Sequence, residues 1–167
     1  MQDDHELWSK LSRGDGEAFE GFYREHASRL RSFLMSCLPS PQAADDVAQE
    51  TFLSLWRHPN GYNPSRSSMK TYFFGIARKR AADWWRHHPS GGQPAAERRA
   101  SGEGSAILVK DAFDRLDTDL RSVLWLREVE GYSYQELAQI LEIPEGTVKS
   151  RLFTAREELR RVWKSRK

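Results

Sequence analysis

The side chains best suited to recognising another molecule lie near the C-terminus, on one side of a segment with helical periodicity. Lys149, Ser150 and Phe153 share that side. A Phe in the middle of a solvated face suits contact with the methyl group of thymine. Lys and Ser suit base edges and phosphates in a major groove. The face therefore predicts binding of duplex DNA, and an ordinary helical hairpin with a basic tail is the alternative.

The sequence before and within this face has the pattern of a helix-turn-helix. Ser133 and Glu136 have the S-x-x-E spacing of a capping box, which starts a helix. Pro144 ends that helix and stands near the start of the next. The second helix has one apolar stripe that recurs at steps of three and four, formed by Val148, Leu152, Ala155, Leu159 and Val162. Two helices joined by so short a turn form this motif.

A second basic segment lies near the middle of the chain. The 167 residues have a formal net charge of only +2, but residues 58–88 hold six basic residues against one acidic residue, and residues 147–167 hold eight against two. The two remaining blocks are acidic. This distribution indicates two contacts with a polyanion, separated by faces that serve another purpose.

Residues 69–88 predict a helix on which aromatic rings alternate with cations. Tyr72, Gly75, Lys79 and Arg86 are expected to face outward, with Arg78 alongside. Rings that stack on bases beside cations that hold phosphates suit an unpaired strand. The alternative is that the aromatic residues form the core. This alternative fits most of them, and Tyr72 is the ring best placed to meet a base.

A third candidate surface is acidic and lies on a helix expected at about residues 41–58. Asp46, Gln49 and Glu50 form a polar face with Leu53 at its centre. Such a face is either solvated with one exposed Leu, or a docking surface on which the acids select a basic partner and Leu53 is the anchor. The periodicity does not decide between the two.

Composition excludes several classes of protein. The single Cys37 excludes a disulfide framework and a Cys-rich zinc site. The sequence has no phosphate-cradling Gly loop, metal cluster or nucleophile–base constellation, so we expect no enzyme activity, catalytic residue, metal or cofactor. No apolar run approaches the length of a membrane span, and the acidic N-terminus is unlike a signal peptide, which predicts a cytoplasmic protein.

The overall expectation is an all-α protein with two small helical domains joined by a flexible linker. The linker is expected at residues 89–104, which are rich in Gly, Pro, Ser and Ala and lack apolar periodicity. It separates a domain at 1–88 from a domain at 105–167 that ends in the helix-turn-helix. Further helices are expected at about 17–38, 105–116 and 119–130.

Three stretches resemble the sigma factors of bacterial RNA polymerase, in particular the small extracytoplasmic-function (ECF) group. DDVAQETFLSLWR resembles the core-binding helix of region 2, and YNPSRSSMKTYFFGIARKRAADWWR resembles its promoter-melting part. Region 4 is similar to LDTDLRSVLWLREVEGYSYQELAQILEIPEGTVKSRLFTAREELR. The order of the three makes the resemblance specific, since a helix-turn-helix alone would be weak support.

The resemblance implies a transcription initiation factor that binds core RNA polymerase and promoter DNA. It implies that core polymerase is bound by Asp45, Asp46, Gln49, Glu50, Leu53 and Trp56. It implies that the unpaired −10 strand is bound by Asn63, Arg66, Tyr72, Arg78, Lys79 and Arg86. It implies that the duplex −35 element is bound by Thr147, Lys149, Ser150, Arg151, Phe153, Thr154 and Arg156.

The resemblance also implies an anti-sigma protein as a partner, although no residue identifies it. Asn63 stands where the family favours Asp, so the base preference there does not carry over. The alternative function is a one-component helix-turn-helix regulator that works without polymerase. That alternative leaves both the basic, aromatic helix at 69–88 and the face around Leu53 without a role.

Overall fold

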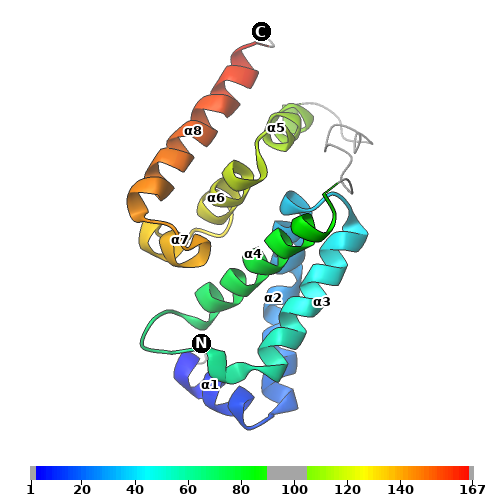
Figure 1. Ribbon diagram of the computed structural model, residues 1–167, viewed down its shortest axis with the longest axis vertical. Coiled ribbons are helices and arrows are strands. Elements are labelled where there is room, and N and C mark those ends of the chain that lie inside the picture. Colours follow the sequence, from blue (N-terminus) through cyan, green and yellow to red (C-terminus); the bar gives the residue numbers. More distant parts are fainter. Residues whose placement is uncertain (1–2, 90–104, 166–167) are drawn as a thin grey trace.

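The computed structural model describes residues 3–89 and 105–165, with side chains from 110 onward in the second range. These residues form helices joined by short loops (Figure 1), which confirms the all-helical class. The expected linker at 89–104 lies outside the described residues except for Pro89. The elements are α1 (Asp4–Ser12), α2 (Gly16–Cys37), α3 (Pro41–Arg57), the 3-10 turn η1 (Pro59–Gly61), α4 (Met69–His87), α5 (Ser105–Asp114), α6 (Thr118–Glu128), α7 (Tyr134–Leu141) and α8 (Glu145–Lys164).

Serine side chains fix where three of the functional helices begin. Ser40, Ser68 and Ser133 each accept, at 3.1 Å, the backbone N–H three residues later, at the starts of α3, α4 and α7. Each such cap contributes about 1 kcal/mol to helix stability. The Ser133 hydroxyl also donates to Oε1 of Glu136 at 3.1 Å, so the predicted helix start at Ser133 is confirmed, with a bond between the two side chains.

The first half of the molecule, α1 to α4, packs around an aromatic core. Phe22, Phe33, Phe52, Phe73 and Phe74 are all buried. The ring of Phe73 lies 5.0 Å from that of Phe22 and 4.8 Å from that of Phe52, in edge-on and tilted arrangements. Such ring pairs add about 0.5–1.5 kcal/mol each beyond burial. The core therefore holds the outer sides of α3 and α4 in fixed positions.

Helix α1 is absent from the sequence-based prediction. Leu7 and Leu11, four residues apart, are buried against the first half. The indole Nε1 of Trp8 donates to the backbone oxygen of Pro59 at 3.1 Å, and Oδ2 of Asp4 accepts the Met69 N–H at 3.0 Å. These contacts attach α1 to η1 and to the start of α4.

The second half contains the predicted helix-turn-helix. Leu137 of α7 and Val148 and Leu152 of α8 are buried with α6, whose Leu126 is fully enclosed. The turn between α7 and α8 includes Glu142 in the left-handed region, at φ 54°. A residue other than Gly in this region costs about 1 kcal/mol or more. The turn is therefore held by packing of the two helices rather than by its own preference.

The two halves are in contact, with α2 against α6 and α4 against α7 (Figure 1). The ring of Phe74 lies 5.8 Å from that of Tyr132, and Nζ of Lys70 lies 3.4 Å from Oε2 of Glu130. Gly75 was expected to face solvent, but it faces α7 instead. A Cβ placed at Gly75 would lie 4.0 Å from the backbone oxygen of Ile140. Helix α7 therefore covers part of the α4 face that the sequence suggested was free.

None of the helices in the described ranges combines the length and apolar character that crossing a bilayer requires.

Candidate polymerase and nucleic-acid interfaces

The outer face of α3 carries the acidic residues that the sequence grouped together. Asp46, Gln49 and Glu50 are exposed and Leu53 is half-buried among them. Oε2 of Glu50 lies 3.6 Å from Nη1 of Arg80, an exposed ion pair of small energy. The face thus presents exposed polar and charged side chains around a half-buried apolar centre.

An aromatic patch lies on the same side and extends onto α2. Trp56 is 37% exposed and its ring lies 4.9 Å from that of Phe19. Tyr23, 49% exposed, packs on Phe52 at 4.7 Å. The sequence-based prediction placed no functional residue on this part of α2. Because Phe22 is buried, its neighbour Tyr23 has to point elsewhere, and that was the signal available. Asp45, in contrast, is drawn towards α2 by an ion pair with Arg31 at 2.8 Å.

The loop between η1 and α4 is organised by its own side chains. Oδ1 of Asn63 accepts the Ser65 N–H at 2.9 Å, and the backbone oxygen of Asn63 accepts the Arg66 N–H at 3.0 Å. The hydroxyl of the buried Tyr62 donates to the Ser67 oxygen at 2.8 Å, and burial raises the pKa of Tyr62 to about 12. Asn63 is therefore a turn former, and both Asn63 and Arg66 are exposed.

The cations of α4 lie beside carboxylates. Nζ of Lys79 lies 2.9 Å from Oε1 of Glu142. This ion pair crosses the interface between the first half (α1 to α4) and the second half (α5 to α8), which we call the joint. This contact lowers the pKa of Glu142. Arg86 pairs with Asp83 on its own helix, and Arg78 is half-buried.

Tyr72 and Arg66 also take part in packing on this side. The ring of Tyr72 is half-buried and lies 5.4 Å from that of Tyr62, so it is less available to a base than the sequence suggested. The amide of Gln139 in α7 donates to the Arg66 oxygen at 3.0 Å. Loop and α4 therefore present one surface, and α7 contacts both of them.

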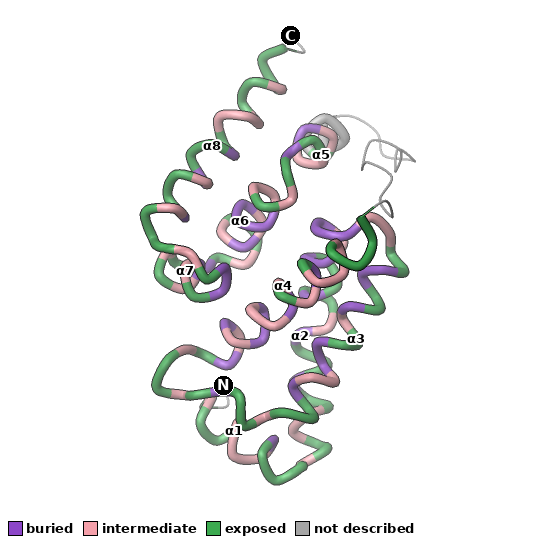
Figure 2. Tube along the Cα trace, viewed as in Figure 1, coloured by how far each residue is buried: buried purple, intermediate pink, exposed green. Residues whose placement is uncertain are grey.

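The outer side of α8 is open by comparison (Figure 2). Phe153 is 67% exposed, and Lys149, Ser150 and Thr154 are exposed beside it. Thr147 and Arg151 are half-buried at its edge. Nζ of Lys149 lies 6.0 Å from the ring centre of Tyr134, which holds the cation close to α7.

Arg156 differs from the other expected −35 residues. Its Nη2 bonds Oε1 of Glu128 in α6 at 2.6 Å, which raises the pKa of Arg156. The residue therefore connects α8 to α6 as well as standing exposed on the helix.

Comparisons with known proteins agree with this arrangement. The family model of sigma-70 region 2 matches residues 22–89, and that of sigma-70 region 4 matches residues 107–159. The RNA polymerase sigma-H factor of Pseudomonas aeruginosa is 28% identical, over 95% of this chain and 93% of the relative. The ECF RNA polymerase sigma-E factor of Escherichia coli K12 is 29% identical, over 93% and 92%.

Solved structures share the fold. CnrH, in complex with the cytosolic domain of CnrY, aligns with a TM-score of 0.78 at 24% identity, over 98% of this chain and 99% of that one. The sigma factor RpoE of Bartonella quintana, in complex with the anti-sigma factor NepR, aligns with a TM-score of 0.69 at 24% identity, over 87% and 96%.

Regions 2 and 4 in this order on one helical chain define a sigma factor, a transcription initiation factor that works with RNA polymerase and is not an enzyme. The chain belongs to the sigma-70 family, in its ECF group. It associates with core polymerase and directs it to promoters. A regulator independent of polymerase is not favoured, because it leaves the whole region 2 match without a role.

Proposed function

We propose that this sigma factor divides promoter recognition between two surfaces of different construction. The exposed face of α8 with Lys149, Ser150 and Phe153 reads the duplex −35 element. The loop from Asn63 to Arg66 and the cations of α4 hold the unpaired −10 strand. The observation that carries this division is Phe153, whose ring is 67% exposed on the second helix of the helix-turn-helix. A ring in that position suits thymine methyl groups in a major groove.

The chemistry of the loop and α4 suits an opened strand rather than a duplex. A base that leaves the stack costs a few kcal/mol, so its binding site has to supply a pocket together with cations along the backbone. Arg66 and Lys79 are exposed cations on two adjoining segments, and the half-buried ring of Tyr72 packs on the buried ring of Tyr62 in the same region. Surface cations that exchange one carboxylate partner for phosphates lose little, because exposed ion pairs are weak.

The α3 face is the polymerase-docking surface in this proposal. The acids around Leu53 direct orientation and partner choice, while Leu53 and Trp56 supply the apolar anchors. The neighbouring ring of Tyr23 extends the same patch onto α2.

An anti-sigma protein is a further partner in this proposal. RpoE of Bartonella quintana was solved with such a protein, and its fold aligns with most of this chain. Because a sigma factor meets polymerase and promoter in the cytoplasm, we place the action of this protein there.

The division is tested by open-complex formation with the full chain and core polymerase, on duplex promoters and on promoters already unpaired at −10. Phe153→Ala is expected to lose duplex recognition, by about 1–3 kcal/mol for a good base contact, and to stay defective on the unpaired template. Lys79→Ala is expected to be defective on duplex and largely rescued by pre-melting. Rescue of Phe153→Ala but not of Lys79→Ala would show that the two surfaces are assigned the wrong way round.

A further inference from the structure

Helix α1 holds both ends of the loop that carries the proposed strand-binding residues. At the first end, the indole Nε1 of Trp8 donates to the backbone oxygen of Pro59 in η1 at 3.1 Å. At the other end, Oδ2 of Asp4 accepts the N–H of Met69, the first residue of α4, at 3.0 Å. Asp4 and Trp8 are about one helical turn apart, so they lie on the same side of α1. One side of α1 therefore brackets residues 59–69.

The helix that brackets the loop is itself fixed to the core. Leu7 and Leu11 are buried, and α1 packs against α2 as well as against η1. These contacts all lie within the first half of the molecule. Another support of the loop, the bond from Gln139 to the Arg66 oxygen, comes from α7 in the second half. The loop therefore has a support in α1 that does not depend on how the two halves meet.

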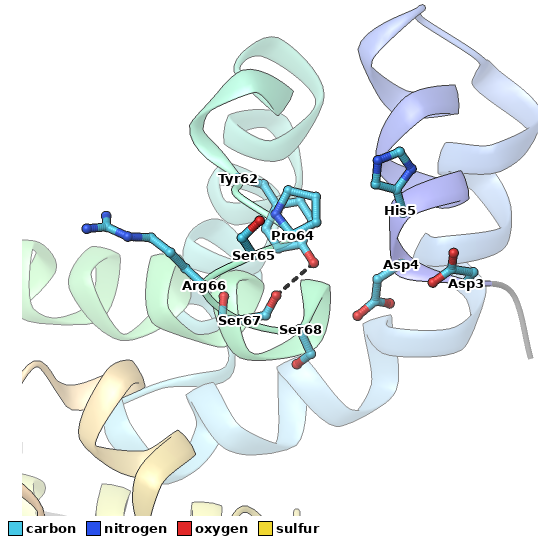
Figure 3. Close-up of a pocket in the computed structure, with 9 residues that line it drawn as sticks. All are labelled: Asp3, Asp4, His5, Tyr62, Pro64, Ser65, Arg66, Ser67 and Ser68. Atoms are coloured by element: carbon cyan, nitrogen blue, oxygen red, sulfur yellow. Dashed lines mark hydrogen bonds between the residues drawn. The ribbon is translucent and has the colours of Figure 1, made fainter.

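Close contacts connect the first end of the loop to α4. Pro59 begins η1, and a Cβ placed at Gly61 in η1 would collide with the hydroxyl of Tyr72. The ring of Tyr62 lies 5.4 Å from that of Tyr72, and the Tyr62 hydroxyl donates to the Ser67 oxygen at 2.8 Å (Figure 3). Because these contacts leave little room, a shift of η1 would also move the Tyr72 ring and the later part of the loop.

The side chains that the loop offers to a strand depend on this support. Asn63 and Arg66 are exposed rather than packed. A loop that samples several conformations binds its ligand with an affinity lowered by the fraction of time that it spends in the competent one. Holding the ends of the loop in advance therefore raises its affinity for the sequence that fits it.

We propose that α1 is a positioning element for strand recognition, in which Trp8 and Asp4 hold the segment from Asn63 to Arg66 in the conformation that binds the −10 strand. Trp8 and Asp4 are positioning residues, which act through the loop and need no contact with DNA. Residues 4–12 precede the stretch that matches sigma-70 region 2, at 22–89, so the proposal gives a function to a part of the chain outside that match. It rests on the proposed binding of the −10 strand by the loop.

The variants that test this proposal remove one bracket at a time. Trp8→Phe keeps an aromatic ring but loses the indole N–H. Asp4→Ala loses the acceptor of the Met69 N–H, whereas Asp4→Asn keeps a side-chain oxygen that can accept it. Glu6→Ala is the matched control, because Glu6 is an exposed acid in the same first turn and pairs with Lys10.

The experiment uses the full chain bound to core RNA polymerase and promoters that are unpaired and randomised across the −10 element. Bound promoters are isolated and their unpaired strand is sequenced, which gives the preference for the strand that the wild type selects over scrambled strands. Affinity for core polymerase, affinity for a duplex −35 element and thermal melting are measured for each variant. A weakened fold lowers all binding together, whereas a displaced loop lowers the strand preference alone.

Trp8→Phe and Asp4→Ala are each expected to lower the strand preference about fivefold, the equivalent of one lost hydrogen bond, with the other affinities unchanged. Scrambled strands are expected to lose less, because cations hold phosphates whatever the sequence. Asp4→Asn and Glu6→Ala are expected to stay within about twofold of the wild type, since neither removes a bracket.

Three outcomes would overturn the inference, and they differ in what else they remove. An unchanged strand preference in Trp8→Phe and Asp4→Ala, beside a clear wild-type preference, would overturn the role of α1 and leave the proposed function standing. Equal losses of polymerase, duplex and strand binding would reduce α1 to a contributor to folding. Absence of any wild-type preference in the unpaired segment would overturn the proposed strand recognition itself. If Asp4→Ala does not fold, Trp8→Phe decides by the same criteria.

Discussion

The two basic surfaces of this protein differ in what already contacts them. On the strand-binding side, Lys79 pairs with Glu142 and the Arg66 oxygen accepts from Gln139, and both partners belong to the second half. On the duplex-reading side, Lys149 and Phe153 stand exposed on α8. In this conformation Lys79 of α4 is paired with a carboxylate of the other half, whereas Arg156 of α8 is paired with Glu128 of its own half.

From this difference we expect the interface between the two halves to restrain the proposed strand-binding surface. The pair between Lys79 and Glu142 is exposed and easily replaced. The apolar part of the joint is stronger, since Tyr132 is buried against Phe74 and beneath Lys70, whose Nζ lies 4.9 Å from its ring centre. Tyr132 is therefore one apolar contact between the halves, and the variants below weaken this interface in steps.

The largest effect is expected for Tyr132→Ala. Removing a buried ring costs about 3–5 kcal/mol of the free energy of unfolding, part of which is the contact between the halves. Where the chain stays folded, the joint opens, and affinity for an unpaired oligonucleotide is expected to rise relative to affinity for duplex. Thermal melting and fluorescence anisotropy with both DNA forms measure the two effects.

Tyr132→Phe is the matched control. The Tyr132 hydroxyl is buried without a hydrogen-bond partner among the described residues, so its removal is expected to be neutral or stabilising and to leave the joint closed. A folded Tyr132→Ala chain that binds the unpaired strand no better than this control would show that the joint does not cover the strand surface.

Leu53→Ala is expected to affect both surfaces alike, because the α3 face is the proposed attachment of the whole protein to polymerase. Truncating a central apolar anchor typically costs about 2 kcal/mol of binding free energy. Leu53 is only half-buried, so the fold is expected to survive. Titration against core polymerase measures the loss, with Glu20→Gln on the exposed side of α2 as control. Undiminished polymerase affinity would remove the α3 face from the proposal.

Local features of the two surfaces could be predicted from the sequence, whereas the contacts between the two halves could not. Helix starts were predictable because Ser40, Ser68 and Ser133 cap within three residues of their own positions. The exposed face of α8 followed from periodicity. Contacts of the joint join residues far apart, such as Cys37 and Ser122 at 3.3 Å, and no local pattern encodes them. Helix α1 was missed because its apolar signal consists of little more than Leu7 and Leu11.

Acid is expected to lower the stability of the fold through His26. Burial lowers the pKa of His26, and its ring lies 4.3 Å from that of Phe22. Lys70 and Arg29 lower that pKa further, while Glu25 and Glu130 oppose them. Because the folded pKa lies below the unfolded value of about 6.5, the unfolded chain binds more protons as pH falls. Stability is complete above about pH 6.5 and declines towards the lowered folded pKa.

Chemical denaturation at pH 7.5 and at pH 5.5 measures this decline. His26→Leu is expected to remove much of it, while His58→Gln, on an exposed loop residue, is expected to retain it. An equal pH dependence in His26→Leu and the wild type would exclude His26 as the cause.

The smallest effect is expected for Glu142→Gln, and it isolates the electrostatic part of the joint. The Glu142 and Lys79 side chains are each 57% exposed, so their contact is worth well under 1 kcal/mol in physiological salt. The contact lowers the pKa of Glu142, so its contribution is present above the usual Glu pKa of about 4.3 and is lost as pH falls through the lowered folded value.

At neutral pH, Glu142→Gln frees Lys79 for phosphate, and affinity for an unpaired oligonucleotide is expected to rise by less than about fivefold. Removing a negative charge near DNA would raise affinity for any strand, so the same substitution is made in a Lys79→Ala background. A gain confined to the chain that retains Lys79 assigns it to this pair. An equal gain in both backgrounds would mean that Glu142 acts only through net charge, and that Lys79 is no more restrained in the free protein than Lys149 on α8.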